Sequence, residues 1–141
     1  MNEMYGTYNF TLDAKGRLFI PAPLRKGLGD SFHVTISTEK CLTAHSNDSW
    51  DNIINKVRAM PIREQTKIRP LFANAAKCEP DSQGRILLPK ALRERVGLSK
   101  NITIVGAGLF VQIWDAELYE PIEAKETTPE NLAAVFEELN F

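Results

Sequence analysis

Apolar and polar residues alternate along residues 5–12 and predict the first strand of the chain. One face would carry Tyr8, Phe10 and Leu12, and the other Thr7, Asn9 and Thr11, as in a half-buried strand. Residues 13–16, Asp-Ala-Lys-Gly, favour a turn, because aspartate accepts hydrogen bonds from nearby amides and glycine adopts positive φ. Residues 17–20 resume the strand pattern, and Pro21 ends it because proline has no N–H for the ladder. Residues 5–20 are therefore predicted to form a β-hairpin.

The same order of elements is then expected twice. In the first half, a short helix over about 23–28 precedes strands at 33–37 and 41–45. In the second, a strand at 75–79, a turn at 81–84 and a strand at 85–88 precede a helix at 89–96 and strands at 101–105 and 109–114. Each half is thus predicted to be β-β-α-β-β.

Helical patterns connect and follow the two halves. A helix capped by Asn47 or Asp48 should run to about Ala59, with an apolar stripe of Trp50, Ile53, Ile54 and Val57. Further helices are expected from Pro61, after Asp115, and from Thr128, the last with Leu132, Val135, Phe136 and Leu139 on one side. The chain therefore divides into a first half (5–47), linking helices (48–73), a second half (74–116) and a helical tail (117–141). The terminal stripe could dock on its own core or on a neighbouring subunit.

A direct repeat underlies the two halves. Residues 81–97 repeat residues 13–29 at an offset of 68 positions. The identical pairs are Asp13/Asp81, Gly16/Gly84, Arg17/Arg85, Pro21/Pro89, Leu24/Leu92, Arg25/Arg93 and Gly29/Gly97. A duplicated unit implies a molecule with internal two-fold pseudo-symmetry, whereas two copies are too few for a solenoid.

Charge is unevenly distributed, although the net charge is only −1. Residues 1–100 hold 16 Lys and Arg against 10 Asp and Glu, whereas residues 101–141 hold one lysine against eight acidic residues. The acid is concentrated in the tail and the repeated region is basic, which permits one face to bind phosphate. No apolar run approaches the roughly 20 residues that span a bilayer.

An arginine follows each turn of the repeat, where a turn itself does not require one. In the pattern Asp-x-x-x-Arg the carboxylate lies across the hairpin from the guanidinium and can hold its planar fork in one orientation. Such an arginine at a protruding end is well placed to bond guanine O6 and N7, or a phosphate, in a DNA groove. From these residues alone, a solvated surface charge explains Arg17 and Arg85 equally well.

Other candidate sites are weaker. Arg25 and Arg93 on the short helices could contact phosphate or pair with an acidic neighbour, and the basic residues of the linking helices (Lys56, Arg58, Arg63, Lys67 and Arg69) are typical of a solvated face. His33 and His45 differ in parity within their hairpin and have no ligand partner at metal-binding spacing. Residues 106–108, Gly-Ala-Gly, open no helix and are interpreted as a hairpin turn rather than a dinucleotide loop. No catalytic motif is present, so we expect neither an enzyme nor a cofactor or metal.

The two motifs, Asp13-Ala-Lys-Gly-Arg-Leu-Phe-Ile-Pro21 and Asp81-Ser-Gln-Gly-Arg-Ile-Leu-Leu-Pro89, resemble those of the MraZ family at the same spacing. Residues 5–17 and 104–115 also match the family pattern, and the resemblance continues to about Pro121. It implies an α+β fold in which two pseudo-symmetric halves form a swapped-hairpin β-core of the AbrB/SpoVT-like, double-psi type, with flanking helices.

The resemblance also implies a function. It is that of a cytoplasmic, nucleoid-associated transcriptional regulator, a repressor of the division and cell-wall gene cluster and of its own promoter. Such a protein forms ring-shaped homo-oligomers that bind short direct repeats in double-stranded DNA. By position, the DNA contacts fall on Asp13, Lys15, Arg17, Asp81, Gln83 and Arg85. Because Gln83 replaces Lys15 in the second copy, the two hairpins are expected to contribute unequally. The alternative is an antitoxin-like swapped-hairpin module whose tail binds a partner protein.

Overall fold

A six-stranded antiparallel sheet forms the body of the protein in the computed structural model, which describes residues 3–140. Its strands lie in the order β1 (Met4–Thr11), β7 (Asn101–Gly108), β8 (Val111–Asp115), β4 (Leu42–Ser46), β3 (Phe32–Ile36) and β5 (Ala76–Cys78). Two further strands, β2 (Arg17–Phe19) and β6 (Arg85–Leu87), form a separate antiparallel pair. The α+β class and the swapped-hairpin arrangement are confirmed. The apolar face predicted along residues 5–12 (Tyr8, Phe10, Leu12) is half-buried, and the polar face is exposed.

The prediction that residues 5–20 form a self-paired hairpin is wrong in its strand pairing. The turn forms where expected, but β1 pairs with β7 along its length, and β2 pairs with β6 of the other half. Two backbone bonds extend this exchange: Ile20 N–H donates to the Gly84 carbonyl, and Leu88 N–H donates to the Gly16 carbonyl. The exchange buries the facing residues Leu18 and Ile86 at the centre of the pair. Burial of apolar surface thus decides the partner, whereas the turn residues decide only the reversal of the chain.

The sheet order is a palindrome under exchange of the two halves. In that exchange β1 corresponds to β5, β2 to β6, β3 to β7 and β4 to β8. The pairs β1–β7 and β5–β3 are then equivalent, while β4–β8 and β2–β6 each join equivalent strands across the pseudo-two-fold axis. The duplication read from the sequence is therefore a structural symmetry.

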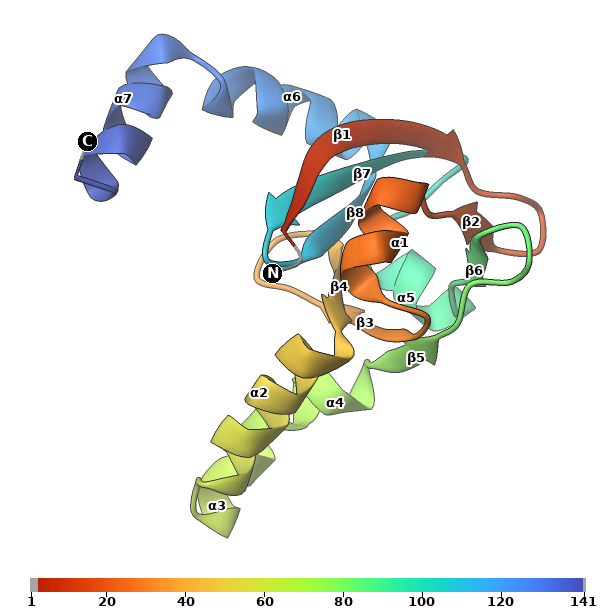
Figure 1. The fold of residues 1–141 in the computed structure, drawn as a ribbon, viewed down its shortest axis with the longest axis vertical. Helices are drawn as coiled ribbons and strands as arrows, with labels where there is room; N and C mark the ends of the chain where they lie inside the picture. The colour runs from red at the N-terminus through yellow and green to blue at the C-terminus, as the bar shows by residue number, and fades with distance from the viewer. Residues whose placement is uncertain (1–2, 141) are drawn as a thin grey trace.

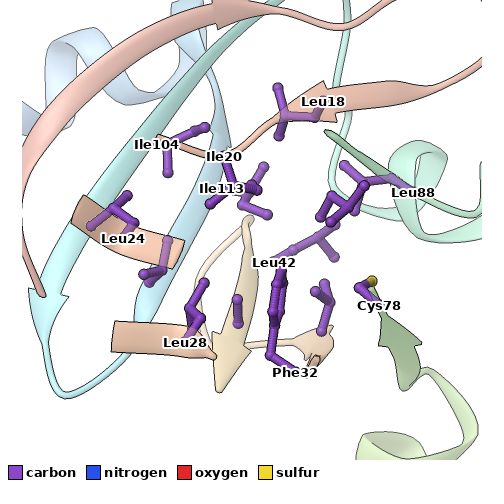
Figure 2. Close-up of a cluster of buried hydrophobic side chains, with 14 of the residues drawn as sticks. Leu18, Ile20, Leu24, Leu28, Phe32, Leu42, Cys78, Leu88, Ile104 and Ile113 are labelled. Atoms are coloured by element: carbon purple, nitrogen blue, oxygen red, sulfur yellow. The ribbon is translucent and has the colours of Figure 1, made fainter. Parts of the chain in front are cut away.

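Two short helices, α1 (Ala22–Leu28) and α5 (Lys90–Arg95), close the core as predicted. Each follows directly on a repeated proline, Pro21 or Pro89, whose fixed φ suits the start of a helix. Side chains from both halves interleave below them (Figure 2). Those of this core that are largest and fully buried are Phe32, Leu18, Ile20, Leu24, Leu28, Leu42, Ile86, Leu88, Ile102, Ile104 and Ile113.

The linking helices extend from the sheet as an arm (Figure 1). We call α2 (Asn47–Arg58), α3 (Ile62–Gln65), the 3₁₀ helix η1 (Thr66–Ile68) and α4 (Arg69–Ala73) the arm. Ser46, rather than Asn47 or Asp48, caps α2, because its hydroxyl accepts from the Ser49 amide at 3.3 Å. The single helix expected from Pro61 is instead three short pieces. Pro70 explains the break before α4, since it lacks the N–H that a continuous helix would need at this position and is tolerated only in the first turn.

The tail consists of α6 (Ala116–Glu126) and α7 (Pro129–Glu138), both predicted. Thr128 caps α7 through a hydrogen bond from the Asn131 amide at 3.3 Å. Figure 1 shows α7 projecting from the body, and its apolar stripe is exposed, from 41% at Leu132 to 61% at Leu139. Within residues 3–140, no helix has the length and apolar character to cross a membrane.

The turn predicted at residues 106–108 is confirmed only at Gly108, because Gly106 and Ala107 are strand residues of β7. The Ala107 amide donates to the Phe110 carbonyl at 2.9 Å, so the chain reverses at Gly108 and Leu109, and Gly108 has a φ of 91°. Gly106 pairs with Gly6 of β1, and a Cβ at position 106 would lie only 2.6 Å from the Tyr5 nitrogen. The glycine is therefore a site of close strand approach.

Candidate nucleic-acid interface

Residues 13–17, here called the first tip, form a turn held by one carboxylate. Asp13 Oδ1 accepts from the amides of Lys15 at 2.9 Å and Arg17 at 2.8 Å, and Oδ2 accepts from Arg17 Nε at 2.6 Å. The Gly16 amide donates to the Asp13 carbonyl, and Gly16 has a φ of 85°, a conformation open to glycine. The carboxylate thus fixes both the turn and the direction of the guanidinium.

Residues 81–85, the second tip, repeat this geometry. Asp81 Oδ1 accepts from the amides of Gln83 at 2.9 Å and Arg85 at 3.0 Å, and Oδ2 accepts from Arg85 Nε at 3.0 Å. The φ of Gly84 is 80°. The predicted Asp–Arg clamp therefore exists in both copies.

Hydrogen bonding holds the pKa of both tip carboxyls below the usual aspartate range. For Asp13 the largest cause is the Arg17 amide, and partial burial acts in the opposite direction. For Asp81 the largest cause is the Arg85 amide, again opposed by partial burial. Both carboxylates are thus ionised at neutral pH, as the clamp requires.

The two tips lie beside one another at one end of the molecule (Figure 1), because β2 and β6 pair directly. The Arg17 side chain is 34% exposed and that of Arg85 is 28% exposed. Each uses Nε for its aspartate, and within residues 3–140 the terminal amino groups have no partner. Two oriented guanidinium groups are therefore available to a ligand at the same end.

Lys15 and Gln83 occupy equivalent exposed positions near the ends of the tips. Their amides bind the tip aspartates, and in the described part of the chain their side chains make no hydrogen bond or ion pair. The first tip thus carries one more positive charge than the second.

Arg25 and Arg93 are half-buried. Arg25 Nε donates to the Ile20 carbonyl at 2.8 Å, and Arg93 Nε donates to the Leu88 carbonyl at 3.0 Å. Neither forms an ion pair with a described acidic residue, so of the two alternatives left open by the sequence, pairing with an acidic neighbour is wrong. In both cases the partner carbonyl belongs to the residue five positions before the arginine, just ahead of the helix.

The two histidines form an aromatic cluster where the arm joins the sheet. His33 and His45 are direct partners in the β3–β4 register, so they share a face, and the parity inferred from the sequence is wrong. Trp50 of α2 stacks on His33 with ring centroids 4.8 Å apart. Burial lowers the pKa of both imidazoles. No group of three or more potential metal ligands occurs among residues 3–140.

The acidic tail and the tips lie at different ends of the molecule (Figure 1). Acidic residues of α6 and α7 are therefore distant from the basic end that Lys15, Arg17 and Arg85 form.

Comparison with known proteins shows one family across almost the entire chain. Residues 4–69 and 71–139 match the family described as "MraZ protein, putative antitoxin-like". The match includes α7, beyond the motifs that carried the resemblance. Proteins named transcriptional regulator MraZ are 41% identical over 125 residues in Acetivibrio thermocellus (86% of this chain, 87% of the relative) and 46% identical over 117 residues in Carboxydothermus hydrogenoformans (81% and 82%). The one from Caldanaerobacter subterraneus subsp. tengcongensis is 36% identical over 140 residues (97% and 96%).

Proposed function

Because this chain belongs to the MraZ family, we propose that it is a transcriptional regulator, not an enzyme, and that it binds double-stranded DNA through its two tips. One observation carries the proposal. The same Asp–Arg clamp occurs in both copies, and the pairing of β2 with β6 holds both arginines at one end.

Each tip residue has a chemical role in this proposal. Arg17 and Arg85 bond base edges in a groove, because a guanidinium with a fixed plane matches the two acceptors of guanine. Asp13 and Asp81, which the resemblance places among the DNA contacts, serve in this proposal by holding the arginines in the binding orientation. Lys15 contacts phosphate, and Gln83 supplies an uncharged hydrogen bond at the equivalent place.

The inequality of the tips follows from electrostatics. A lysine that neutralises a phosphate releases counterions, whereas a glutamine does not. We therefore propose that the first tip contributes more of the salt-dependent affinity and that the second contributes mainly through Arg85.

We further propose that several subunits assemble into a ring, as a homo-oligomer that binds short direct repeats in a promoter. In this assembly the exposed apolar stripe of α7 would be one contact surface, and its partner would be the arm of a second copy of the chain. The arm carries an apolar hollow of about 330 Å³ with Ile36, Ile68, Pro70 and Leu71 in its wall and Lys67 at the side. The acidic α7 and the basic arm are complementary in charge.

Ring assembly would allow weak individual contacts. Repeats spaced by about one helical turn would meet successive subunits on the same side of the duplex. Linking the sites raises the effective concentration for each further contact. In this proposal the protein acts in the cytoplasm on the nucleoid, and represses its own operon in the division and cell-wall gene cluster by blocking polymerase.

Gel-shift titration against the region upstream of the gene, at two salt concentrations, tests the tips. Arg17→Ala together with Arg85→Ala should abolish specific binding. The matched control is Lys40→Ala with Lys125→Ala, which removes the same charge from exposed positions outside the tips, the arm and α7 and should keep specificity. Unchanged binding by the tip variant would overturn the proposal.

Light scattering tests the ring. The wild-type chain should be larger than a dimer, and Leu132→Glu with Val135→Glu in α7 should reduce its mass. A monomeric wild-type protein would contradict the ring, and an unchanged mass in the variant would contradict the role of α7. The alternative, an antitoxin-like module, predicts that α7 binds a different protein and that the chain shows no specific shift with its own promoter.

A further inference from the structure

Arg25 packs against the tip of the other half. A Cβ placed on Gly84 of the second tip would lie 3.0 Å from Arg25 Cζ and 3.1 Å from its Nε. The guanidinium therefore occupies the space that the absence of a side chain at Gly84 provides. It is anchored there by the bond from its Nε to the Ile20 carbonyl of its own half.

Arg93 makes the reciprocal contact. A Cβ on Gly16 of the first tip would lie 2.9 Å from Arg93 Cζ and from its Nη2. Arg93 is anchored to its own half through the Leu88 carbonyl. Each arginine also shares a surface hollow with the opposite clamp aspartate: Arg25 lies beside Asp81 in one of about 320 Å³, and Arg93 lies beside Asp13 in one of about 460 Å³.

We propose that Arg25 and Arg93 are crossed positioning residues, each of which sets the tip of the opposite half. The proposal rests on the proposed function, because the tips matter only if they read DNA. It assigns Arg93 to the orientation of Arg17 and Arg25 to the orientation of Arg85.

The physical reason lies in how the tips are supported. Each tip projects past the sheet, and the strand that leaves it pairs over only three residues. A backbone bond from the opposite half reaches the glycine carbonyl of each tip, and the opposite arginine covers the same glycine. A guanidinium bonded through Nε is planar and keeps one orientation, so it can support the tip. A lysine would keep the positive charge but has no Nε–H donor and no planar group.

The two supports are unequal. At Gly84 the nearest atom to a Cβ would be Phe19 Cε1, at 2.9 Å, ahead of Arg25. The Phe19 ring is itself held by Phe10, with centroids 5.1 Å apart, and by Arg25 above it at 5.6 Å. At Gly16 the three nearest atoms all belong to Arg93. The first tip should therefore depend on Arg93 more than the second depends on Arg25.

Hydrogen exchange of the full-length protein without DNA tests the crossing. Arg93→Lys should speed exchange of the Gly16 and Arg17 amides about tenfold, because about one hydrogen bond's worth of support is lost, and should leave the second tip unchanged. Arg25→Lys should speed the Gly84 and Arg85 amides by a smaller factor. Faster exchange confined to the tip of the same half, or no change at either tip, would overturn the proposal. If Arg93→Lys prevents folding, Arg93→Gln replaces it, with the same expected pattern.

A double-mutant cycle in DNA affinity separates positioning from direct contact. Arg93→Lys should weaken binding about tenfold in the wild-type background but less than about twofold when Arg17 is already alanine. Equal losses in both backgrounds would show that Arg93 acts independently of Arg17 and would overturn the proposal. If Arg17→Ala with Arg85→Ala leaves binding intact, the proposed function fails, while the exchange data still decide whether the tips are positioned across the halves.

Discussion

Gly106→Ala should destabilise the fold far more than a turn substitution would. The new methyl group would lie 2.6 Å from the Tyr5 nitrogen and 2.7 Å from the Met4 carbonyl carbon. Carbon atoms pack best at about 3.5–4.0 Å, so β1 must move by roughly 1 Å at this point. The atoms in the way are backbone, and no side-chain rotation relieves the overlap.

The expected cost follows from what that movement breaks. Displacing Met4, Tyr5 and Gly6 weakens two or three ladder bonds, each of which contributes about 1 kcal/mol. It also opens the site of Met4, which is 2% exposed, and full burial of such a side chain contributes about 1.5–3 kcal/mol. Alanine restricts the unfolded chain and returns about 0.4–1 kcal/mol. We expect a net loss of about 2–4 kcal/mol.

Urea unfolding followed by circular dichroism measures this loss. The control is Ala107→Ser, at the adjacent exposed position, which should stay within about 0.5 kcal/mol of wild type. In a chain that lacks residues 1–5 the overlap is absent, so Gly106→Ala should there cost less than about 1 kcal/mol. A small effect in the full chain, or the same large effect in both chains, would refute the close-approach explanation.

Three further predictions concern ionisation and the arm. In NMR titrations the pKa of Asp13 and of Asp81 should lie below the ordinary aspartate pKa of about 3.9. Their contribution to stability is then complete above that pH and is lost as the pH falls through the lowered pKa. A pKa at or above the ordinary aspartate value would contradict the clamp. Burial lowers the pKa of His33 and His45, and for His33 Lys77 acts in the same direction while Asp51 opposes it. Below about pH 6.5 the unfolded chain therefore takes up more protons than the folded one, and the free energy of unfolding should fall from pH 7.5 to 5.0. The double variant His33→Gln with His45→Gln should flatten this pH dependence, and an unchanged dependence would exclude the histidines as its source. Trp50, which is 7% exposed and packs on both histidines and Phe72, should cost about 3–5 kcal/mol when changed to alanine. Limited proteolysis should then cut the arm faster in that variant, and equal cutting rates would show that Trp50 does not hold the arm.

Local features of the chain could be predicted because local chemistry determines them. The carboxylate at Asp13 and the glycine at Gly16 build the tip within five residues, and the apolar face of β1 follows from alternation alone. Strand partners could not be predicted in this way. Nothing near Leu18 in the sequence indicates that it faces Ile86, since that pairing depends on burial across 68 positions.

The remaining errors have the same origin in long-range contact. Gly106 has the composition of a turn, and only the approach of β1 shows that it is a strand glycine. Strand alternation alone placed His33 and His45 on different faces, because it does not give the register between two strands. The β3–β4 turn sets that register and makes the two histidines direct partners. The packing of Arg25 on Gly84 could have been suspected from the repeat, since both members of each pair recur, but repetition alone does not say that the contact crosses between halves.

The crossing also explains why the two repeats occur in a single chain. The first two strands of each half find their partners only in the other half: β1 on β7, β2 on β6 and β5 on β3. Separated from the second half, the first would retain only the β3–β4 hairpin among its strand pairs, and an isolated hairpin is marginally stable in water. Covalent linkage makes this pairing intramolecular, and it allows the two tips to diverge, since Lys15 and Gln83 need not be the same residue. A symmetric homodimer of identical halves could not carry that difference, so unequal tips require the two repeats to be joined in one chain.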